Sequence, residues 1–182
     1  MTALDFMSAW VSQGIHEEPD GSNRGPEIDA WCEAMGFAKG QPWCATSVSA
    51  AFRKAKLETP VSEIHGLETF PYSQSSQAIK RWFQQKGWWT RNPDELLRWR
   101  GALGGWTNAD GAHGHIFMIG ERYSHDGEVL RIGTREGNSN DAGSRNGNRM
   151  VKNRRGVPTD GKRELWFCDT SHIIGGSWWP PV

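Results

Sequence analysis

Apolar residues in the first half of the chain recur at helical spacing, and those in the second half fall into short runs between glycines and polar residues. The first pattern predicts four helices, and Gly14 and Gly36 stand where a glycine would end the first two. The predicted helices cover residues 3–13, 26–35, 43–55 and 73–85. A break of glycine and proline at residues 40–42 precedes the third helix, so Cys44 falls in its first turn.

The second pattern, after Gly101, predicts strands. Four runs rich in isoleucine, valine, phenylalanine and leucine are separated by turn formers, and we expect them to pair antiparallel. They cover residues 114–121, 128–135, 148–152 and 164–168. Helices first and strands second, without βαβ alternation, indicate the α+β class. We expect one domain over residues 1–182, with its sheet packed against the helix that bears Cys44.

Charge and hydropathy narrow the range of partners. Lysine plus arginine number 21 and aspartate plus glutamate number 21, so the chain lacks the positive field of a general nucleic-acid binder. No apolar run approaches the roughly 20 residues that span a bilayer, and residues 1–10 lack the basic cluster of a signal peptide. We therefore expect a protein that is made in the cytoplasm, acts as a monomer and binds neither nucleic acid nor membrane.

One of the three cysteines is a candidate nucleophile. Cys32, Cys44 and Cys168 form an odd set without CxxC spacing, which argues against a disulfide framework and a zinc cage. Cys44 stands at a predicted helix start, where unpaired N–H groups and the helix dipole favour a thiolate and could also receive an oxyanion. Position alone is equally compatible with a small buried hydrophobic residue.

A histidine in front of an apolar strand favours a catalytic role for Cys44 over a packing role. His115 follows Gly114 and precedes Ile-Phe-Met-Ile in the first predicted strand. A histidine fixed on a strand edge that faces a helix start has the geometry that a cysteine hydrolase needs from its general base. His113 is the competitor, but it lies in the loop that enters the strand. We assign the base to His115; a surface or supporting role for either ring is the alternative.

The imidazole of such a base must be held in one tautomer by a third group. Glu136 and Asn138 follow the next predicted strand and could lie beside His115 across the sheet. We expect one of them to accept the proton on Nδ1 of the imidazole. The same segment is also a good turn sequence, whose polar side chains could serve only to satisfy backbone groups.

Four segments in order along the chain carry a family resemblance. They are Ser22-Asn-Arg-Gly-Pro-Glu-Ile-Asp29, Gly40-Gln-Pro-Trp-Cys44-Ala, Gly114-His115-Ile and Glu136-Gly-Asn138. Together they resemble the CHAP family, the cysteine, histidine-dependent amidohydrolases and peptidases. The most specific segment is Pro-Trp-Cys followed by an alanine-rich helix. The likeness extends over residues 15–155.

The resemblance implies a papain-like α+β fold and hydrolysis of amide bonds in peptidoglycan, as an N-acetylmuramoyl-L-alanine amidase or a peptide endopeptidase. It assigns catalytic roles to Cys44 as nucleophile, His115 as base, Glu136 as the group that orients the imidazole, and Asn138 as a group that polarises the carbonyl or steadies the site. The candidates for contact with substrate or oxyanion are Gln41, Trp43 and Asn23. The acidic DxDxxxG run with which some relatives bind calcium is absent, and we expect no cofactor.

Other functions stay open at this point. We expect a phage-type endolysin or a related lytic protein, because the chain is compact and carries no export signal. A cysteine amidase or peptidase toxin fits those features equally well. A non-catalytic wall-binding protein is the third possibility. Eleven tryptophans against two tyrosines supply rings that could stack on sugars, although core packing is their commoner role.

Two metal sites are weaker alternatives. Zinc could be held by His113, His115 and either Cys44 or His125, since alternate residues of a strand can chelate, but a fourth well-placed ligand is missing. Calcium could bind the acidic loop at residues 17–23, which lacks the alternating oxygen ligands of an EF-type loop. We expect no metal and a solvated loop that faces the substrate.

Overall fold

The computed structural model describes residues 1–96, 98–111, 113–122, 131–139, 147–156 and 164–176. Four α-helices come first within this part of the chain: α1 (Ala3–Gln13), α2 (Pro26–Met35), α3 (Cys44–Glu58) and α4 (Ser76–Lys86). Six strands follow them: β1 (Trp89–Thr90), β2 (Leu103–Thr107), β3 (Gly114–Arg122), β4 (Arg131–Ser139), β5 (Arg149–Gly156) and β6 (Glu164–Cys168). Two short 3-10 helices, Val61–Glu63 and Pro93–Glu95, complete the described elements.

Local sequence explains where the first helices begin and end. The side chain of Thr2 accepts a hydrogen bond from the backbone N–H of Asp5 (3.3 Å), and the Asp5 carboxylate accepts one from Thr2 N–H (2.8 Å). Gly14 ends α1 in the left-handed conformation, with φ at 69°. Helix α3 begins differently, since it has neither a side-chain cap nor an acidic residue in its first turn.

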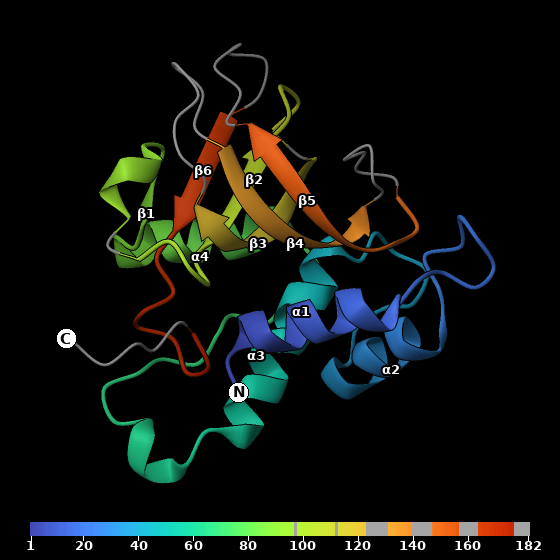
Figure 1. The fold of residues 1–182 in the computed structure, drawn as a ribbon, viewed down its shortest axis with the longest axis horizontal. Coiled ribbons are helices and arrows are strands. Elements are labelled where there is room, and N and C mark those ends of the chain that lie inside the picture. The colour runs from blue at the N-terminus through green and yellow to red at the C-terminus, as the bar shows by residue number, and fades with distance from the viewer. Residues whose placement is uncertain (97, 112, 123–130, 140–146, 157–163, 177–182) are drawn as a thin grey trace.

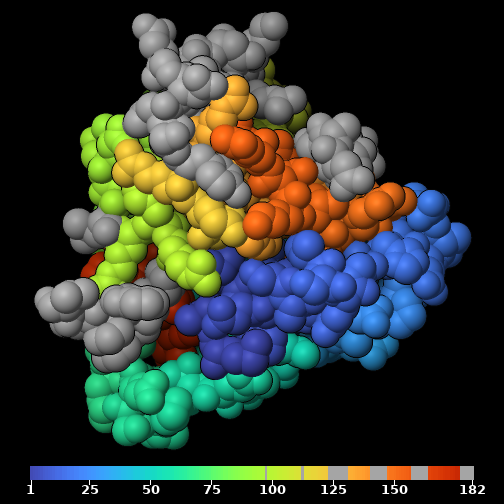
Figure 2. All heavy atoms as spheres, viewed as in Figure 1, coloured from blue at the N-terminus to red at the C-terminus, as the bar shows by residue number. Residues whose placement is uncertain are grey.

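The strands form one antiparallel sheet in the order β1-β6-β2-β3-β4-β5. Helices α1 and α3 pack on β3 and β4, and α4 packs on β1, β3 and β6, so the helices lie on the sheet in Figure 1. The space-filling view shows the blue N-terminal residues directly against the orange residues of β5 (Figure 2). The expected α+β class, with N-terminal helices on a C-terminal antiparallel sheet, is confirmed.

Alternate residues of β3 serve the two faces of this sheet. Ile116 and Met118 are fully buried in the larger core, between the sheet and the helices. Phe117 and Ile119 belong to a smaller cluster on the other face. The His115 ring lies beside Phe117, with ring centroids 6.4 Å apart, so His115 belongs to this second face. The sheet therefore stands between His115 and most of the helical layer.

Strand β2 is the main element that the sequence pattern does not predict. Its sequence, LGGWT, looks like a loop because it contains Gly104 and Gly105. A methyl group on Gly104 would lie 2.4 Å from the Phe117 ring, and one on Gly105 would lie 2.3 Å from the Trp166 ring. The two glycines thus make room for aromatic rings that pack onto the strand. Strand β4 runs on to Ser139, beyond the predicted end at residue 135; residues 128–130 lie outside the described part.

The tryptophans divide between core and surface. Five are buried: Trp10, Trp31, Trp43, Trp106 and Trp166. Four are partly exposed: Trp82, Trp88, Trp89 and Trp99. Trp178 and Trp179 lie outside the described residues. Core packing is thus the commoner role among those described. None of the helices in the described ranges is both long enough and apolar enough to cross a bilayer.

Candidate active site

Cys44 is the first residue of α3 and is 7% exposed. The first helical hydrogen bond runs from the N–H of Ser47 to the carbonyl of Trp43 (2.9 Å), so the N–H groups of residues 44–46 have no acceptor within the helix. No acidic side chain occupies this first turn. The positive end of the helix dipole therefore acts on the Cys44 sulfur without a competing carboxylate in the first turn of α3.

Two polar side chains hold the residue in front of the cysteine. The indole Nε1 of Trp43, which is fully buried, donates to the Glu17 carboxylate at 2.8 Å. In the amide orientation that satisfies its neighbours, Asn138 accepts from the backbone N–H of Trp43 (3.2 Å) and donates to the carbonyl of Gly147 (2.5 Å). Asn138 adopts a left-handed conformation, with φ at 52°. Trp43 thus contributes to the site by fixing the backbone before Cys44.

Strand β4 approaches α3 closely because residue 137 is a glycine. A methyl group on Gly137 would lie 2.4 Å from Ser47 Oγ and 2.8 Å from the Trp43 ring. Only a residue without a side chain lets the first turn of α3 lie this near the strand that carries Glu136.

The Cys44 sulfur contacts the sheet at a stretch of β3 that is not paired with β4. Residues 114–118 of β3 pair with β2, but the pairing of β3 with β4 begins only at Met118 and continues to Arg122. The start of α3 fits beside this open stretch of β3. The backbone N–H of Ile116 accordingly hydrogen-bonds Cys44, as does that of Ala45 in the helix.

His115 is fully buried and faces the cysteine with one ring nitrogen. Its Nε2 lies 3.0 Å from an oxygen of Glu136, so the expectation that the third group would accept from Nδ1 is wrong. Nδ1 has no hydrogen-bond partner among the described residues, and the Cys44 thiol is the other group that acts on the ring. Trp106, which pairs with His115 from the neighbouring strand β2, places its ring centroid 4.8 Å from that of His115. Nδ1 is thereby left to exchange a proton with sulfur.

Glu136 is the residue that holds the imidazole. It is fully buried, and its two oxygens also accept from the Thr134 hydroxyl and from the guanidinium of Arg155. Burial alone would raise the pKa of Glu136, but the hydrogen bonds and positive charges of His115 and Arg155 hold that pKa far below its ordinary value. Glu136 is therefore a carboxylate at any physiological pH.

The buried Cys44 and His115 shift each other's protonation. Burial raises the pKa of Cys44, but hydrogen bonding to His115, the charge of that ring and two backbone N–H groups outweigh it and bring the pKa below its ordinary value. Burial lowers the pKa of His115, yet bonding to Cys44 and Glu136 raises it to about 9. Both directions favour a thiolate beside an imidazolium at neutral pH.

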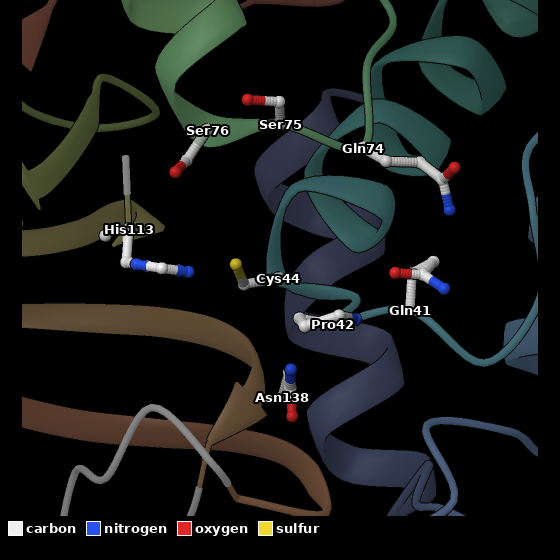
Figure 3. Close-up of a pocket in the computed structure, with 9 residues that line it drawn as sticks. Gln41, Pro42, Cys44, Gln74, Ser75, Ser76, His113 and Asn138 are labelled. Atoms are coloured by element: carbon white, nitrogen blue, oxygen red, sulfur yellow. The ribbon is translucent and has the colours of Figure 1, made fainter. Parts of the chain in front are cut away.

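A cavity of about 300 Å³ opens over the sulfur and is called here the first cavity. Its lining includes Gln41, Pro42, Cys44, Gln74, His113 and Asn138. Figure 3 shows Cys44, His113 and Asn138 directed toward the same space. His113 is exposed and pairs with Asp110 (2.7 Å), so of the two candidate histidines it stands at the mouth and His115 behind the sulfur.

A second cavity, of about 640 Å³, adjoins the first, with which it shares Pro42 and Asn138. Asn23 lies in this second cavity, together with Glu17 and Arg149, and does not line the space over Cys44. Gln41 lines the first cavity. Of the three residues expected to contact substrate or oxyanion, two therefore line a cavity and one, Trp43, is buried.

The metal alternatives find little support in the described ranges. No three histidine, cysteine, aspartate or glutamate side chains gather there in a group that could hold an ion, and His125 lies outside these ranges. The acidic loop is exposed at residues 18–21, as expected, but Glu17 at its start is only 2% exposed and bonds Trp43. A buried carboxylate that supports the start of α3 is a structural role that the sequence pattern does not indicate.

Comparison of the chain with protein-family models, with curated proteins and with solved structures found no match. The candidate site therefore stands on its own geometry and on the motifs in the sequence. Those motifs do not point to Thr134, Arg155 or Glu17, which the structure adds to the surroundings of Cys44 and His115.

Proposed function

We propose that this chain is a cysteine hydrolase of the CHAP type, with a papain-like arrangement, that cleaves amide bonds in peptidoglycan. The observation that carries the proposal is the row formed by Cys44, His115 and Glu136. A thiol stands at an uncapped helix start, a buried imidazole faces it with Nδ1, and a carboxylate 3.0 Å away holds the opposite ring nitrogen. A cysteine that only packs in the core does not need an aligned base and a carboxylate that orients it, whereas a nucleophile does.

The first half of the proposed reaction forms a thioester. The Cys44 thiolate attacks the amide carbonyl carbon, and the carbonyl oxygen becomes an oxyanion. N–H groups in the first turn of α3, aided by the Gln41 side chain at the cavity wall, stabilise that charge. As the C–N bond breaks, the imidazolium of His115 gives its proton to the departing nitrogen, and the amine leaves.

The second half restores the enzyme. Neutral His115 accepts a proton from a water molecule as the water oxygen attacks the thioester carbon. Collapse of this second oxyanion breaks the C–S bond and yields a carboxylic acid and the thiolate. Glu136 stays ionised throughout, and its role is to keep the ring oriented and to stabilise the imidazolium.

Peptidoglycan as the substrate rests on the likeness of the four sequence segments to the CHAP family, and the cavities are compatible with it. The first and second cavities adjoin at Pro42 and Asn138, which gives a branched substrate room beyond the sulfur. The wall of the second cavity carries Glu17, Asn23 and Arg149, groups that can bind the charged ends and amides of a stem peptide.

Digestion of purified sacculi tests the proposal. Wild-type protein should release new amino groups from sacculi, and mass spectrometry of the fragments should name the cleaved bond. An amidase would free the amino group of L-alanine, whereas an endopeptidase would free one within the peptide. Cys44→Ala and Cys44→Ser should fold and release none.

The matched control is Cys32→Ser, which changes another buried cysteine of the helical layer, on α2, away from the cavity. It should digest sacculi like the wild type. Full activity in either Cys44 variant, or no new amino groups from any of several wall chemotypes, would refute the proposal. In the latter case rapid alkylation of Cys44 by iodoacetamide would still indicate a reactive thiol, and slow alkylation would favour a non-catalytic binder.

A further inference from the structure

Arg155 reaches Glu136 from the neighbouring strand. In the pairing of β4 with β5 it stands opposite Ile132, on the same face of the sheet as Thr134 and Glu136. Its side chain runs along β4 and hydrogen-bonds both oxygens of the Glu136 carboxylate. Nε donates to Oε1 at 2.5 Å, and Nη2 donates to Oε2, the oxygen that also faces His115. Such a two-pronged pair fixes the plane of the carboxylate, which a single hydrogen bond cannot do.

Aromatic rings hold the guanidinium in this place. It lies over the Trp106 ring at 4.8 Å and over the Phe117 ring at 5.8 Å. The same Trp106 ring packs beside His115. The Arg155 side chain is only 17% exposed, so its position is set by packing as well as by charge. One tryptophan thus contacts both the imidazole and the cation that serves its carboxylate.

We propose that Arg155 is a positioning residue of this site: by holding both oxygens of Glu136, it keeps the carboxylate directed at Nε2 of His115, so that Nδ1 faces Cys44. The role rests on the proposed function only in requiring that Cys44 and His115 react as a pair. It does not depend on which amide is cleaved.

The alternation of charge supports this role. Thiolate, imidazolium, carboxylate and guanidinium follow one another from α3 through β3 and β4 to β5, and the row as a whole is neutral. Among the described residues, the charged groups that act most strongly on His115 are Cys44 and Glu136, and those on Glu136 are His115 and Arg155. Without Arg155, a buried carboxylate would lose the partner that binds both of its oxygens, and it would either take up a proton or turn away from the ring.

The pH dependence of Cys44 alkylation by iodoacetamide tests the proposal without any substrate. Arg155→Met removes the charge but keeps a side chain that can lie on Trp106, and Arg155→Lys keeps the charge with a single prong. We expect Arg155→Met to raise the apparent pKa of alkylation by about one unit or more and to slow the reaction near pH 6 about ten-fold, because a Glu136 that is protonated or turned away no longer stabilises the imidazolium next to Cys44, and an opposite charge in contact shifts a pKa by about one to three units. Arg155→Lys should lie between it and the wild type.

Arg135→Met is the matched control. Arg135 is a similarly buried arginine on β4 with a two-pronged pair to Glu121, and it does not bond Glu136. Its replacement should weaken the sheet to a similar degree and leave the alkylation profile unchanged. A profile for Arg155→Met that matches the wild type, or that moves to lower pH, would overturn the proposal, and so would an equal change in Arg135→Met.

A spectroscopic measurement covers the case in which Arg155→Met does not fold. In protein labelled with ¹⁵N in its histidine rings, His115 of the wild type should show a slowly exchanging proton on Nε2. That signal should broaden or exchange faster in Arg155→Lys, and an unchanged signal would count against a positioning role. Failure of the wild type to digest sacculi would reject the proposed substrate but leave both of these results informative.

Discussion

Replacing Gly137 by alanine should move the start of α3 away from β4 and so separate Cys44 from His115 without changing either residue. The new methyl group would lie 2.4 Å from Ser47 Oγ, 2.8 Å from Ser47 Cβ and 2.8 Å from the Trp43 ring. Carbon atoms in contact prefer about 3.5–4.0 Å, so the two surfaces must part by about 1 Å. The Ser47 hydroxyl can rotate, but Ser47 Cβ and the fully buried Trp43 ring move only with the helix.

This displacement should lower both the free energy of unfolding and the reaction rate of Cys44. Forcing a methyl group into a packed contact costs about 1–3 kcal/mol of unfolding free energy. A reacting group misplaced by 1 Å can lose about 100-fold in rate. We therefore expect Gly137→Ala to fold, to lose about 1–3 kcal/mol in urea unfolding, and to alkylate Cys44 more slowly near neutral pH, by up to about 100-fold.

Gly120→Ala is the matched control, because its methyl group would lie 2.8 Å from the end of the flexible Arg135 side chain, which can move aside. Its alkylation rate should stay within a factor of about two of the wild-type rate, as the site is untouched. Wild-type alkylation in Gly137→Ala, together with an unfolding free energy changed by less than about 0.5 kcal/mol, would show that α3 is not positioned by this contact.

Three further outcomes follow from the site. The rate of amide hydrolysis should form a bell against pH, rising as Cys44 ionises below its ordinary pKa and falling near pH 9 as His115 loses the proton that the leaving amine needs; a fall already at pH 7 would contradict the thiolate–imidazolium pair. Trp43→Phe should cost about 1–3 kcal/mol in urea unfolding, because buried Glu17 loses its indole donor, and unchanged stability would contradict that role. Asn138→Ala should slow Cys44 alkylation several-fold by freeing the N–H of Trp43, and a wild-type rate would show that Asn138 does not hold the backbone before Cys44.

The helices could be predicted because their signals are local. The apolar spacing and the terminal glycines of α1 and α2 fix both ends, and the structure has the same bounds, Ala3–Gln13 and Pro26–Met35. The predicted start of α3, at residue 43, lies one residue before the observed start at Cys44, because Gly40 and Pro42 interrupt any earlier helix; the helix runs on to Glu58, beyond the predicted end at residue 55. Strand β2 could not be predicted. Its glycines make room for rings of β3 and β6, and local sequence does not show that those rings pack there.

The site likewise combines residues that local motifs predict with contacts that only the tertiary structure sets. Cys44, His115 and Glu136 are brought together by the structure as the motifs suggest, but the ring nitrogen that meets Glu136 is set by the parting of β3 from β4, a tertiary feature. Arg155 gave no motif because its link to Glu136 depends on the register of β5. The predicted strand covered residues 148–152, whereas β5 runs on to Gly156, so the sequence pattern did not place Arg155 in the sheet.

Attack of Cys44 on the amide, which leaves the acyl group on the sulfur, can be measured directly. Soluble wall peptides are mixed with the enzyme, the reaction is quenched with acid within the first turnovers, and the mass of the intact protein is recorded. We expect a transient added mass that equals the acyl fragment, that lies on the Cys44 peptide after digestion of the quenched protein, and that hydroxylamine removes. Release of the same fragments with Cys44 unmodified at every time point, at a rate that Cys44→Ser retains, would contradict it.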